Sequence, residues 1–349
     1  MKHFKDCLKH KAFDPTKSRG RRNIYPDDDS VYFDCIEPFR LCTHKILNSK
    51  ARRRGDDKTQ VLCDPENPHI RTRSRHTNEV VSLSTKIAEI TGLNPSLCEA
   101  IAQGHDIGHA PYGHMTENFI TRVTGKNFKH DTFGVVVAQY IERKGWGMNL
   151  SYEVLKGISV HSRGSSELSV GNDLPLEFDV VMFSDKIAYT FSDVNDAIRC
   201  GHFKEIDFPK EVLELGKNQR ERTFACLKAL IAESAESGKI SFSKSEVSQK
   251  FLSIRNWMYE NYYRKVNWSV QKAILAETYE FLSHDAFFEG CDPAIVLALM
   301  TDRELNELGN IFLRGRRPGS EDIRNFSIAE IIPFIRGKNI NFTDPDLNW

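Results

Sequence analysis

Apolar side chains recur at three- and four-residue intervals along much of this chain, which is the spacing expected of amphipathic helices. One such stretch runs from His76 to Thr91 and is followed by Gly92, a residue suited to the end of a helix. Its apolar positions are Val80, Leu83, Ile87 and Ile90. The pattern therefore predicts a helix that carries His76 in its first turn.

A second helix is predicted directly after the first. Asn94 is a suitable N-cap, and Pro95 suits the first helical position. The residues that share one face of this helix are Cys98, Ile101, Ala102 and His105. The resulting helical hairpin would bring His76 toward His105.

The same periodicity predicts helices along most of the remaining chain. They cover Val135 to Arg143, Tyr152 to Val160, Phe178 to Arg199, Glu211 to Ser237, Lys244 to Tyr263 and Ser269 to Leu282, and packed helices follow from about residue 285. Strand signals are few and short, and no internal repeat occurs in the sequence. The predicted fold class is all-α, with one main helical domain and peripheral additions along the 349 residues.

Two basic segments fall outside these helices. Residues 1 to about 25 are rich in lysine and arginine and precede the run Asp27-Asp28-Asp29, which predicts a solvated arm. A tail that contacts nucleic-acid phosphates, or an oligomer contact, is the alternative for this arm. The second segment, Lys50 with Arg52 to Arg54, comes before Pro65 and Pro68 and is predicted to be a loop.

Composition narrows the class of protein. The 48 basic and 48 acidic residues give a net charge of zero, so the molecule as a whole has no attraction to nucleic acid or membrane. Its eight cysteines form no C-x-x-C pair, which argues against a zinc ribbon and against a secreted disulfide framework. Without an apolar run near the ~20 residues that span a bilayer, the sequence predicts a soluble, cytoplasmic protein with no membrane partner.

The pair His105-Asp106 is the first candidate for chemistry. An adjacent imidazole and carboxylate at the end of an apolar helix can bind one divalent cation, provided that a further histidine and carboxylate arrive from elsewhere. His76 and Asp185 are the candidates. The dipeptide alone is weak support, because it recurs at His130-Asp131 and His284-Asp285, and an ordinary histidine at a helix end is the alternative.

Asp185 lies in the middle of an apolar stretch. On the predicted helix Phe178 to Arg199 it shares one face with Tyr189 and Asp193, at positions i, i+4 and i+8. A carboxylate on so apolar a helix costs several kcal/mol unless it is paired or bound to metal. Asp185 therefore needs a partner, which is either a metal ion or an arginine.

His114 and Glu117 are candidates for proton transfer. They stand three residues apart, so a helix after Pro111 would let the carboxylate orient the imidazole and raise its pKa, as a general acid requires. A surface contact between the two is the alternative. For His130, the sequence leaves a functional role and an exposed loop position equally open.

Three segments match a known family in order and spacing. They are Arg71 to Val80 (RTRSRHTNEV), His105 to His114 (HDIGHAPYGH) and Asp185 to Tyr189 (DKIAY). Supporting matches are Arg52-Arg53 with Lys58 to Val61, and Gly147 to Leu155 leading to Gly157-Ile158 and His161. Over roughly residues 50 to 200 the chain resembles the HD-superfamily deoxynucleoside triphosphate triphosphohydrolases, and most closely the bacterial dGTPase-like branch.

The resemblance implies a role for each matching residue. The implied metal ligands are His76, His105, Asp106 and Asp185, and the implied catalytic group is His114, Glu117 and His130. Arg73, His109 and Lys186 would contact the triphosphate, while Tyr189, Asp193 and Tyr263 would lie beside the deoxyribose, with Asp193 hydrogen-bonded to its 3'-hydroxyl. The implied reaction converts a deoxynucleoside triphosphate (dNTP), dGTP or a broader range, and water into deoxynucleoside and tripolyphosphate.

The resemblance also implies an organisation and a set of partners. A basic arm and lead-in (1–49) would precede an HD core (50–200), and a C-terminal helical region (201–349) would complete the substrate pocket and the oligomer contacts. The histidine and carboxylate ligands suit Mn²⁺, Fe²⁺, Ni²⁺ or Zn²⁺, with Mg²⁺ entering on the triphosphate. A homo-oligomer and a regulatory nucleotide or single-stranded DNA are further implied partners.

The chain departs from the family pattern after the arginine pair. Relatives have Leu-Gln there, whereas this chain has Arg54-Gly55-Asp56, so a glutamine expected near the sugar is absent or displaced. Two rival functions stay open. One is another HD phosphohydrolase, namely a 5'-nucleotidase or an alarmone or cyclic-nucleotide phosphodiesterase, and the other is a non-catalytic nucleotide or single-stranded nucleic-acid binder.

Overall fold

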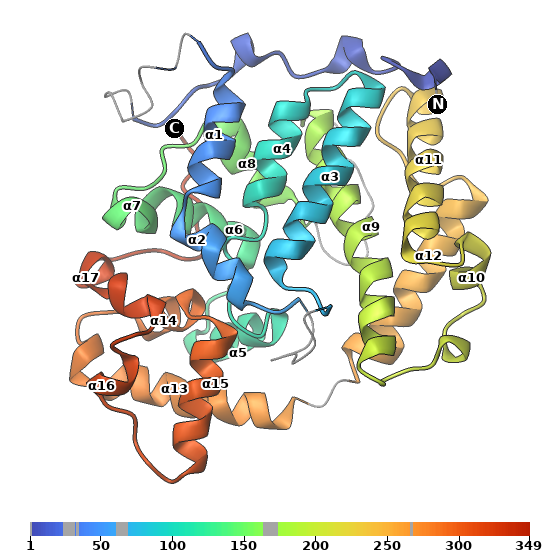
Figure 1. Ribbon diagram of the computed structural model, residues 1–349. Helices are drawn as coiled ribbons and strands as arrows, with labels where there is room; N and C mark the ends of the chain where they lie inside the picture. Colours follow the sequence, from blue (N-terminus) through green and yellow to red (C-terminus); the bar gives the residue numbers. More distant parts are fainter. Residues whose placement is uncertain (1, 24–31, 33–34, 61–68, 163–173, 266–267) are drawn as a thin grey trace.

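The computed structural model describes residues 2–23, 32, 35–60, 69–162, 174–265 and 268–349 (Figure 1). Helices are the regular structure in these ranges, where only two isolated β-bridges, Arg21 to Ser151 and Thr59 to Thr72, are found. The all-α prediction is therefore confirmed. The run Asp27 to Asp29 and the prolines 65 and 68 lie outside the described residues.

Helices α3 (Arg73–Thr91) and α4 (Pro95–Gly104) form the predicted hairpin at the centre of the molecule. α3 begins after Thr72, whose hydroxyl accepts a hydrogen bond from the backbone N–H of Arg75, and it ends at Gly92 with a left-handed φ of 82°. α4 packs against α1 (Pro38–Leu47), and α3 packs against the long helix α9 (Leu176–Arg199). α4 also packs against α9, so the hairpin and α9 form one packed group of helices.

Helices α5 (His114–Thr124), α6 (His130–Val136) and α8 (Tyr152–Val160) surround the end of α4. The turn after α4 passes very close to α6. A Cβ atom added to Gly108 would lie 2.1 Å from the backbone nitrogen of Gly134 and 2.2 Å from the carbonyl oxygen of His130. Only glycine at position 108 lets the turn come this near to the helix that carries His130.

We expect Gly108→Ala to destabilise the fold, because the new methyl group meets backbone rather than a side chain that can move. The free energy of unfolding should fall by about 1–3 kcal/mol or more, which is the cost of overpacking a filled core. Thermal unfolding would measure this as a Tm lowered by several degrees. Gly319→Ala is the control, because its Cβ would meet no atom within 4 Å; equal Tm values for the two variants would contradict the expectation.

The C-terminal half supplies two peripheral groups of helices. One, beside α9 in Figure 1, contains α10 (Glu211–Leu215), α11 (Gln219–Ser237) and α12 (Glu246–Met258), which continues into a π-helical turn, η8 (Tyr259–Tyr263). The other lies below the core in the same view and contains α13 (Ser269–His284), α14 (Pro293–Leu299), α15 (Asp302–Leu313), α16 (Ser320–Ile323) and α17 (Ile332–Ile335). None of the described helices is long and apolar enough to cross a membrane.

Two predicted helices have different bounds in the structure. The helix predicted over 211–237 is two helices, because Gly216 breaks it at a φ of 158° and Asn218 caps the second one. The helix predicted from Val135 begins at His130 instead, and left-handed φ angles at Arg143 and Lys144 interrupt its end.

The two basic segments were predicted wrongly. Lys50 to Arg54 is a short helix, α2, because the Ser49 hydroxyl caps it and Glu142 accepts hydrogen bonds from the backbone N–H groups of Lys50 and Ala51. The described part of the N-terminal arm is not a solvated tail. Leu8 is fully buried and donates its N–H to the carbonyl of Thr91, so this segment packs on the core.

Candidate metal centre and active site

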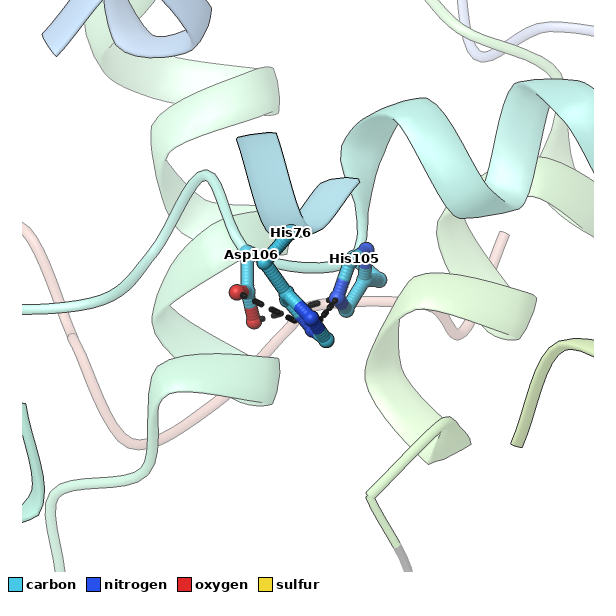
Figure 2. A group of neighbouring side chains, drawn as sticks. All are labelled: His76, His105 and Asp106. Carbon is cyan, nitrogen blue, oxygen red and sulfur yellow. Dashed lines mark hydrogen bonds and ion pairs between the residues drawn. The ribbon is translucent and has the colours of Figure 1, made fainter. Parts of the chain in front are cut away.

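Four side chains from three helical segments meet in the space between α3, α4 and α9. His76 projects from the first turn of α3, and His105 and Asp106 follow the last turn of α4 (Figure 2). Asp185 comes from the middle of α9. The capped start of α3 brings His76 close to the end of α4, where His105 and Asp106 follow Gly104. The helical hairpin predicted from the sequence leads to the same arrangement.

The distances among these four residues are short. Nε2 of His76 lies 2.9 Å from Oδ1 of Asp185 and 3.4 Å from Nε2 of His105. Nε2 of His105 is in turn 3.3 Å from Oδ1 of Asp106. We call these four residues the ligand cluster. All four side chains are largely buried, and Asp185 is the most exposed at 15%.

The chemistry of the ligand cluster fits a divalent cation. Nδ1 of His105 donates to the carbonyl of Ala102 at 2.7 Å, which leaves the lone pair of Nε2 directed at the other members. Burial raises the pKa of Asp185, but its hydrogen bond with His76 and the nearby imidazoles outweigh burial and hold that pKa below its ordinary value. Ligand atoms of His76, His105 and Asp106 lie within 4.8 Å of one another, and Asp185 adjoins them through its contact with His76, so the four side chains offer a donor set that could hold a divalent transition metal.

Asp106 also connects the ligand cluster to its surroundings. One carboxylate oxygen pairs with Nη1 of Arg73 at 3.1 Å, and the other lies 3.2 Å from Nε2 of His109. Burial raises the pKa of Asp106, but His105, His109 and Arg73 outweigh burial and keep the carboxyl well below its usual range. Asp106 is therefore a carboxylate, as a metal ligand must be.

Glu117 is the centre of a second cluster, next to the first. Its carboxylate accepts a hydrogen bond from Nδ1 of His130 at 2.8 Å, and lies 3.3 Å from Nδ1 of His109 and of His114. Burial raises the pKa of Glu117, but the charges of His130 and His114 outweigh it, so the group stays ionised. The contact expected between His114 and Glu117 is thus present, and α5 has the helical form that it required.

His130 is buried, although the sequence left an exposed loop position open. It begins α6, is 6% exposed, and its ring stacks on that of His109 with centroids 3.7 Å apart. Burial lowers the pKa of His130, but the carboxylate of Glu117 outweighs burial and raises this pKa to about 9. By contrast, burial and the charges of Arg73 and His130 lower the pKa of His109 to about 3. The stack therefore pairs a neutral ring with a charged one.

A cavity of about 820 Å³ opens above both clusters. All of the candidate site residues line it except His105, which is fully buried behind the ligand cluster. The lining also includes Tyr259 and Tyr263 of the π-helical turn, and Trp268, Lys272 and Leu275 at the start of α13. Residues from the C-terminal half therefore form one wall of the cavity.

One end of the cavity carries a buried acid. Asp193 pairs with Arg71 at 2.8 Å and accepts a hydrogen bond from the hydroxyl of Tyr263 at 2.6 Å. Burial raises the pKa of Asp193 to about 6, and Arg71 only partly offsets this. Tyr189, one turn earlier on α9, accepts a hydrogen bond from Nε of the buried Arg255 at 3.1 Å. Polar contacts at the hydroxyl groups thus hold the rings of Tyr189 and Tyr263 in position.

Several residues at the site had not been singled out from the sequence. Gln60 lines the cavity, and its Oε1 is buried without a hydrogen-bond partner among the described residues, so a glutamine is present at the site despite the departure at Arg54 to Asp56. Lys58 is buried and donates to the carbonyl of His109 at 2.5 Å. Asp302, at the start of α15, accepts from the backbone N–H of Tyr112. The matching segment Lys58 to Val61 contains Lys58 and Gln60 and is the sequence signal that could have indicated them, whereas no sequence signal marks Asp302.

Comparison with known proteins agrees with this geometry. The family model for the HD domain matches residues 73–190, which span the ligand cluster and the cluster around Glu117. Curated relatives share 35% identity over 75% of this chain and 76% of the protein from Caldanaerobacter subterraneus subsp. tengcongensis, and 35% over 81% of this chain and 83% of the protein from Desulfatibacillum aliphaticivorans. A relative from Clostridium perfringens is 38% identical over 64% of this chain and 67% of its own length. Each is named a deoxyguanosinetriphosphate triphosphohydrolase-like protein, and the chain belongs to this family of HD-domain phosphohydrolases.

Proposed function

We propose that this protein hydrolyses deoxynucleoside triphosphates to deoxynucleoside and tripolyphosphate. One observation carries the proposal: His109 joins the two clusters, with Nε2 against Asp106 of the ligand cluster and Nδ1 against Glu117. A cation-binding centre and a proton-donating group are therefore separated by a single side chain, that of His109. Hydrolysis of a phosphate ester at a sugar oxygen needs both, because the attacked phosphorus and the leaving oxygen are neighbours.

The ligand cluster would hold a divalent metal through His76, His105, Asp106 and Asp185. Bound there, the metal would supply Lewis-acid polarisation of a phosphate oxygen. Its ligand types favour Mn²⁺, Fe²⁺, Ni²⁺ or Zn²⁺, and Mg²⁺ would enter with the triphosphate. Arg73 and Lys186 line the same part of the cavity and would offset the negative charge of the phosphates.

The cluster around Glu117 would supply the proton. Attack of water at the α-phosphorus breaks the bond to the 5'-oxygen, and that oxygen leaves as an alkoxide unless it receives a proton. His114 is 73% exposed at the cavity and would donate this proton, oriented by Glu117. His130, which is charged and hydrogen-bonded to Glu117, would hold the Glu117 carboxylate in position while His114 gives up its proton.

The other end of the cavity would bind the sugar. The carboxylate of Asp193 and the amide oxygen of Gln60 are acceptors for the 3'-hydroxyl, and the rings of Tyr189 and Tyr263 would pack against the deoxyribose. Acceptors for a free 3'-hydroxyl favour a deoxynucleoside triphosphate over alarmones and cyclic nucleotides, in which the 3'-oxygen carries phosphate. The names of the relatives support the same substrate class.

Product analysis tests the proposal. Purified protein with Mn²⁺ or Mg²⁺ is incubated with each common dNTP and rNTP in ¹⁸O-labelled water. The phosphate products are then separated and analysed by mass spectrometry. We expect dNTP to give deoxynucleoside and tripolyphosphate, with the label in the tripolyphosphate because water attacks phosphorus. Release of orthophosphate or pyrophosphate would contradict the proposal, and binding of single-stranded DNA without any hydrolysis would favour the non-catalytic rival.

The role of Asp193 gives a further prediction. If its carboxylate accepts the 3'-hydroxyl, Asp193→Asn should lower kcat/KM for a dNTP by about tenfold to a hundredfold, as expected for a hydrogen bond to a charged group. A 2',3'-dideoxy analogue lacks that hydroxyl, so its kcat/KM should change much less. Steady-state kinetics with the matched pair of substrates measures the difference. An equal loss on both would show that Asp193 acts only by holding Arg71 and Tyr263.

A further inference from the structure

His161, at the end of α8, joins neither the ligand cluster nor the group assigned to proton transfer. It is 1% exposed and lies on the wall of the cavity. Nδ1 of its ring donates to the carbonyl of Ile158 at 2.7 Å, three residues earlier. His105 uses the same contact with the carbonyl of Ala102 at the end of α4. In both cases the backbone of a helix end fixes the ring and turns Nε2 toward the site.

The hydrogen bonds around His161 determine which nitrogens carry protons. Because Nδ1 of His161 donates to a carbonyl, Nε2 of its neutral ring is an acceptor. Nε2 of His130 lies 3.3 Å from it and is the donor, because the charged ring is the one next to a carboxylate. The other nitrogen of His130, Nδ1, faces the carboxylate of Glu117 at 2.8 Å. Both neighbours of His130 are acceptors, so its ring carries both protons and each is used.

We propose that His161 is a positioning residue for proton transfer, because its Nε2 accepts the hydrogen bond from Nε2–H of His130 and so holds that ring in its doubly protonated state against Glu117. The effect of this hydrogen bond on catalysis rests on the proposed function. A flipped His130 ring, or a neutral ring with its one proton on Nε2, would present a carbon or a lone pair to the carboxylate, and Glu117 would lose its shortest contact. His161 therefore acts on the leaving oxygen only through His130 and Glu117.

The charges nearby agree with this arrangement. Only one proton can lie between the two Nε2 atoms, and the carboxylate of Glu117, 2.8 Å from Nδ1 of His130, favours the charged form of His130 over that of His161, which leaves Nε2 of His161 as the acceptor. The groups around His130 are Glu117, Asp106, Asp131, His109, His114 and His161. Of these, the three carboxylates favour the charged ring, and His161 accepts the hydrogen bond from its Nε2–H. Without this acceptor, the buried Nε2–H of His130 would lack a hydrogen-bond partner, at a cost of about 1–3 kcal/mol in stability.

His161 also touches the ligand cluster, which provides a rival explanation that an experiment must separate. Its ring meets that of His105 edge-on, with centroids 5.1 Å apart. If support of the metal ligand were its main task, its loss would lower the affinity for metal. If the acceptor role is its task, metal binding stays and proton transfer suffers.

The test compares His161→Phe, which keeps a ring but has no acceptor, with His161→Gln, which restores an acceptor oxygen. We expect His161→Phe to lower kcat for dNTP hydrolysis by about tenfold to a hundredfold, the usual cost of losing a hydrogen bond that orients a functional histidine. KM and bound metal should be unchanged, and His161→Gln should recover part of the loss. His44→Phe, at an exposed position of α1, is the control and should retain full activity. A kcat within about twofold of the unaltered protein, or a loss that excess metal reverses, would overturn the proposal.

A measurement on the unaltered protein tests the hydrogen bond without relying on activity or on the folding of a variant. In ¹⁵N-histidine-labelled, Zn²⁺-loaded protein, the bond should give a scalar coupling between Nε2 of His130 and Nε2 of His161. Both ring protons of His130 should also be observed. An uncoupled pair, or one ring proton on His130, would overturn the inference even if the protein hydrolyses dNTPs as proposed. Conversely, the coupling would stand if the substrate proved to be different.

Discussion

Replacing Asp185 by asparagine is expected to lower kcat for dNTP hydrolysis by about three orders of magnitude or more. The substitution keeps the shape of the side chain but removes one of the two negative charges in the ligand cluster. Loss of the metal would remove several kcal/mol of stabilisation from the transition state, and each 1.36 kcal/mol is worth about tenfold in rate. Steady-state kinetics and metal analysis of the same sample measure activity and occupancy together.

Asp179→Asn is the matched control for this prediction. It makes the same change on the same helix, α9, at a position that is also buried but does not line the cavity. Its activity and metal content should stay near those of the unaltered protein. Full activity in Asp185→Asn, or full metal content together with lost activity, would show that Asp185 is not the ligand that the geometry indicates.

The ligand cluster was predictable from the sequence because local signals place its members. Asn94 and Pro95 begin α4, Gly92 ends α3, and these ends set which turns carry His76 and His105. Asp185 was predictable for another reason, since a carboxylate in an apolar helix requires a partner. In the structure that partner is His76, at 2.9 Å, rather than an arginine.

Residues that act over long sequence separations gave no such signal. Lys58 reaches the carbonyl of His109, and Asp302 reaches the backbone N–H of Tyr112, across 51 and 190 positions of the chain. Neither contact leaves a periodic pattern or a capping motif at its own position. His161 was part of a matching motif, but its acceptor role follows only from the positions of three rings in space.

The errors in the fold have physical causes of the same kind. The helix α2 was missed because three arginines and nearby glycine and prolines indicate a loop, whereas Glu142, 91 positions away, caps its start. The charges of the N-terminal arm alone predict a solvated segment. Its few apolar residues, such as Leu8, decide its place by packing against the end of α3.

Replacing Glu117 by glutamine is expected to lower kcat by about 10²- to 10⁴-fold, the usual contribution of general acid catalysis. Glutamine keeps the size of the side chain but cannot supply the charge that three histidines surround. His114 would lose its orientation, and His130 would lose the group that raises its pKa. Metal content should not change, because Glu117 is not in the ligand cluster. Glu89→Gln, at an exposed position of α3, is the control and should remain fully active.

The pH dependence of stability separates this explanation from a general loss of folding. Because the pKa of His130 is raised to about 9 in the folded protein, its pairing with Glu117 stabilises the fold fully below the unfolded value of about 6.5, and this contribution is lost as pH rises through about 9. The Tm of the unaltered protein should therefore exceed that of Glu117→Gln most at about pH 6, and the gap should narrow above pH 9. A Tm difference that stays constant over this range would mean that the charge pair is not what Glu117 contributes. The loss of activity would then have to come from the orientation of His114 alone.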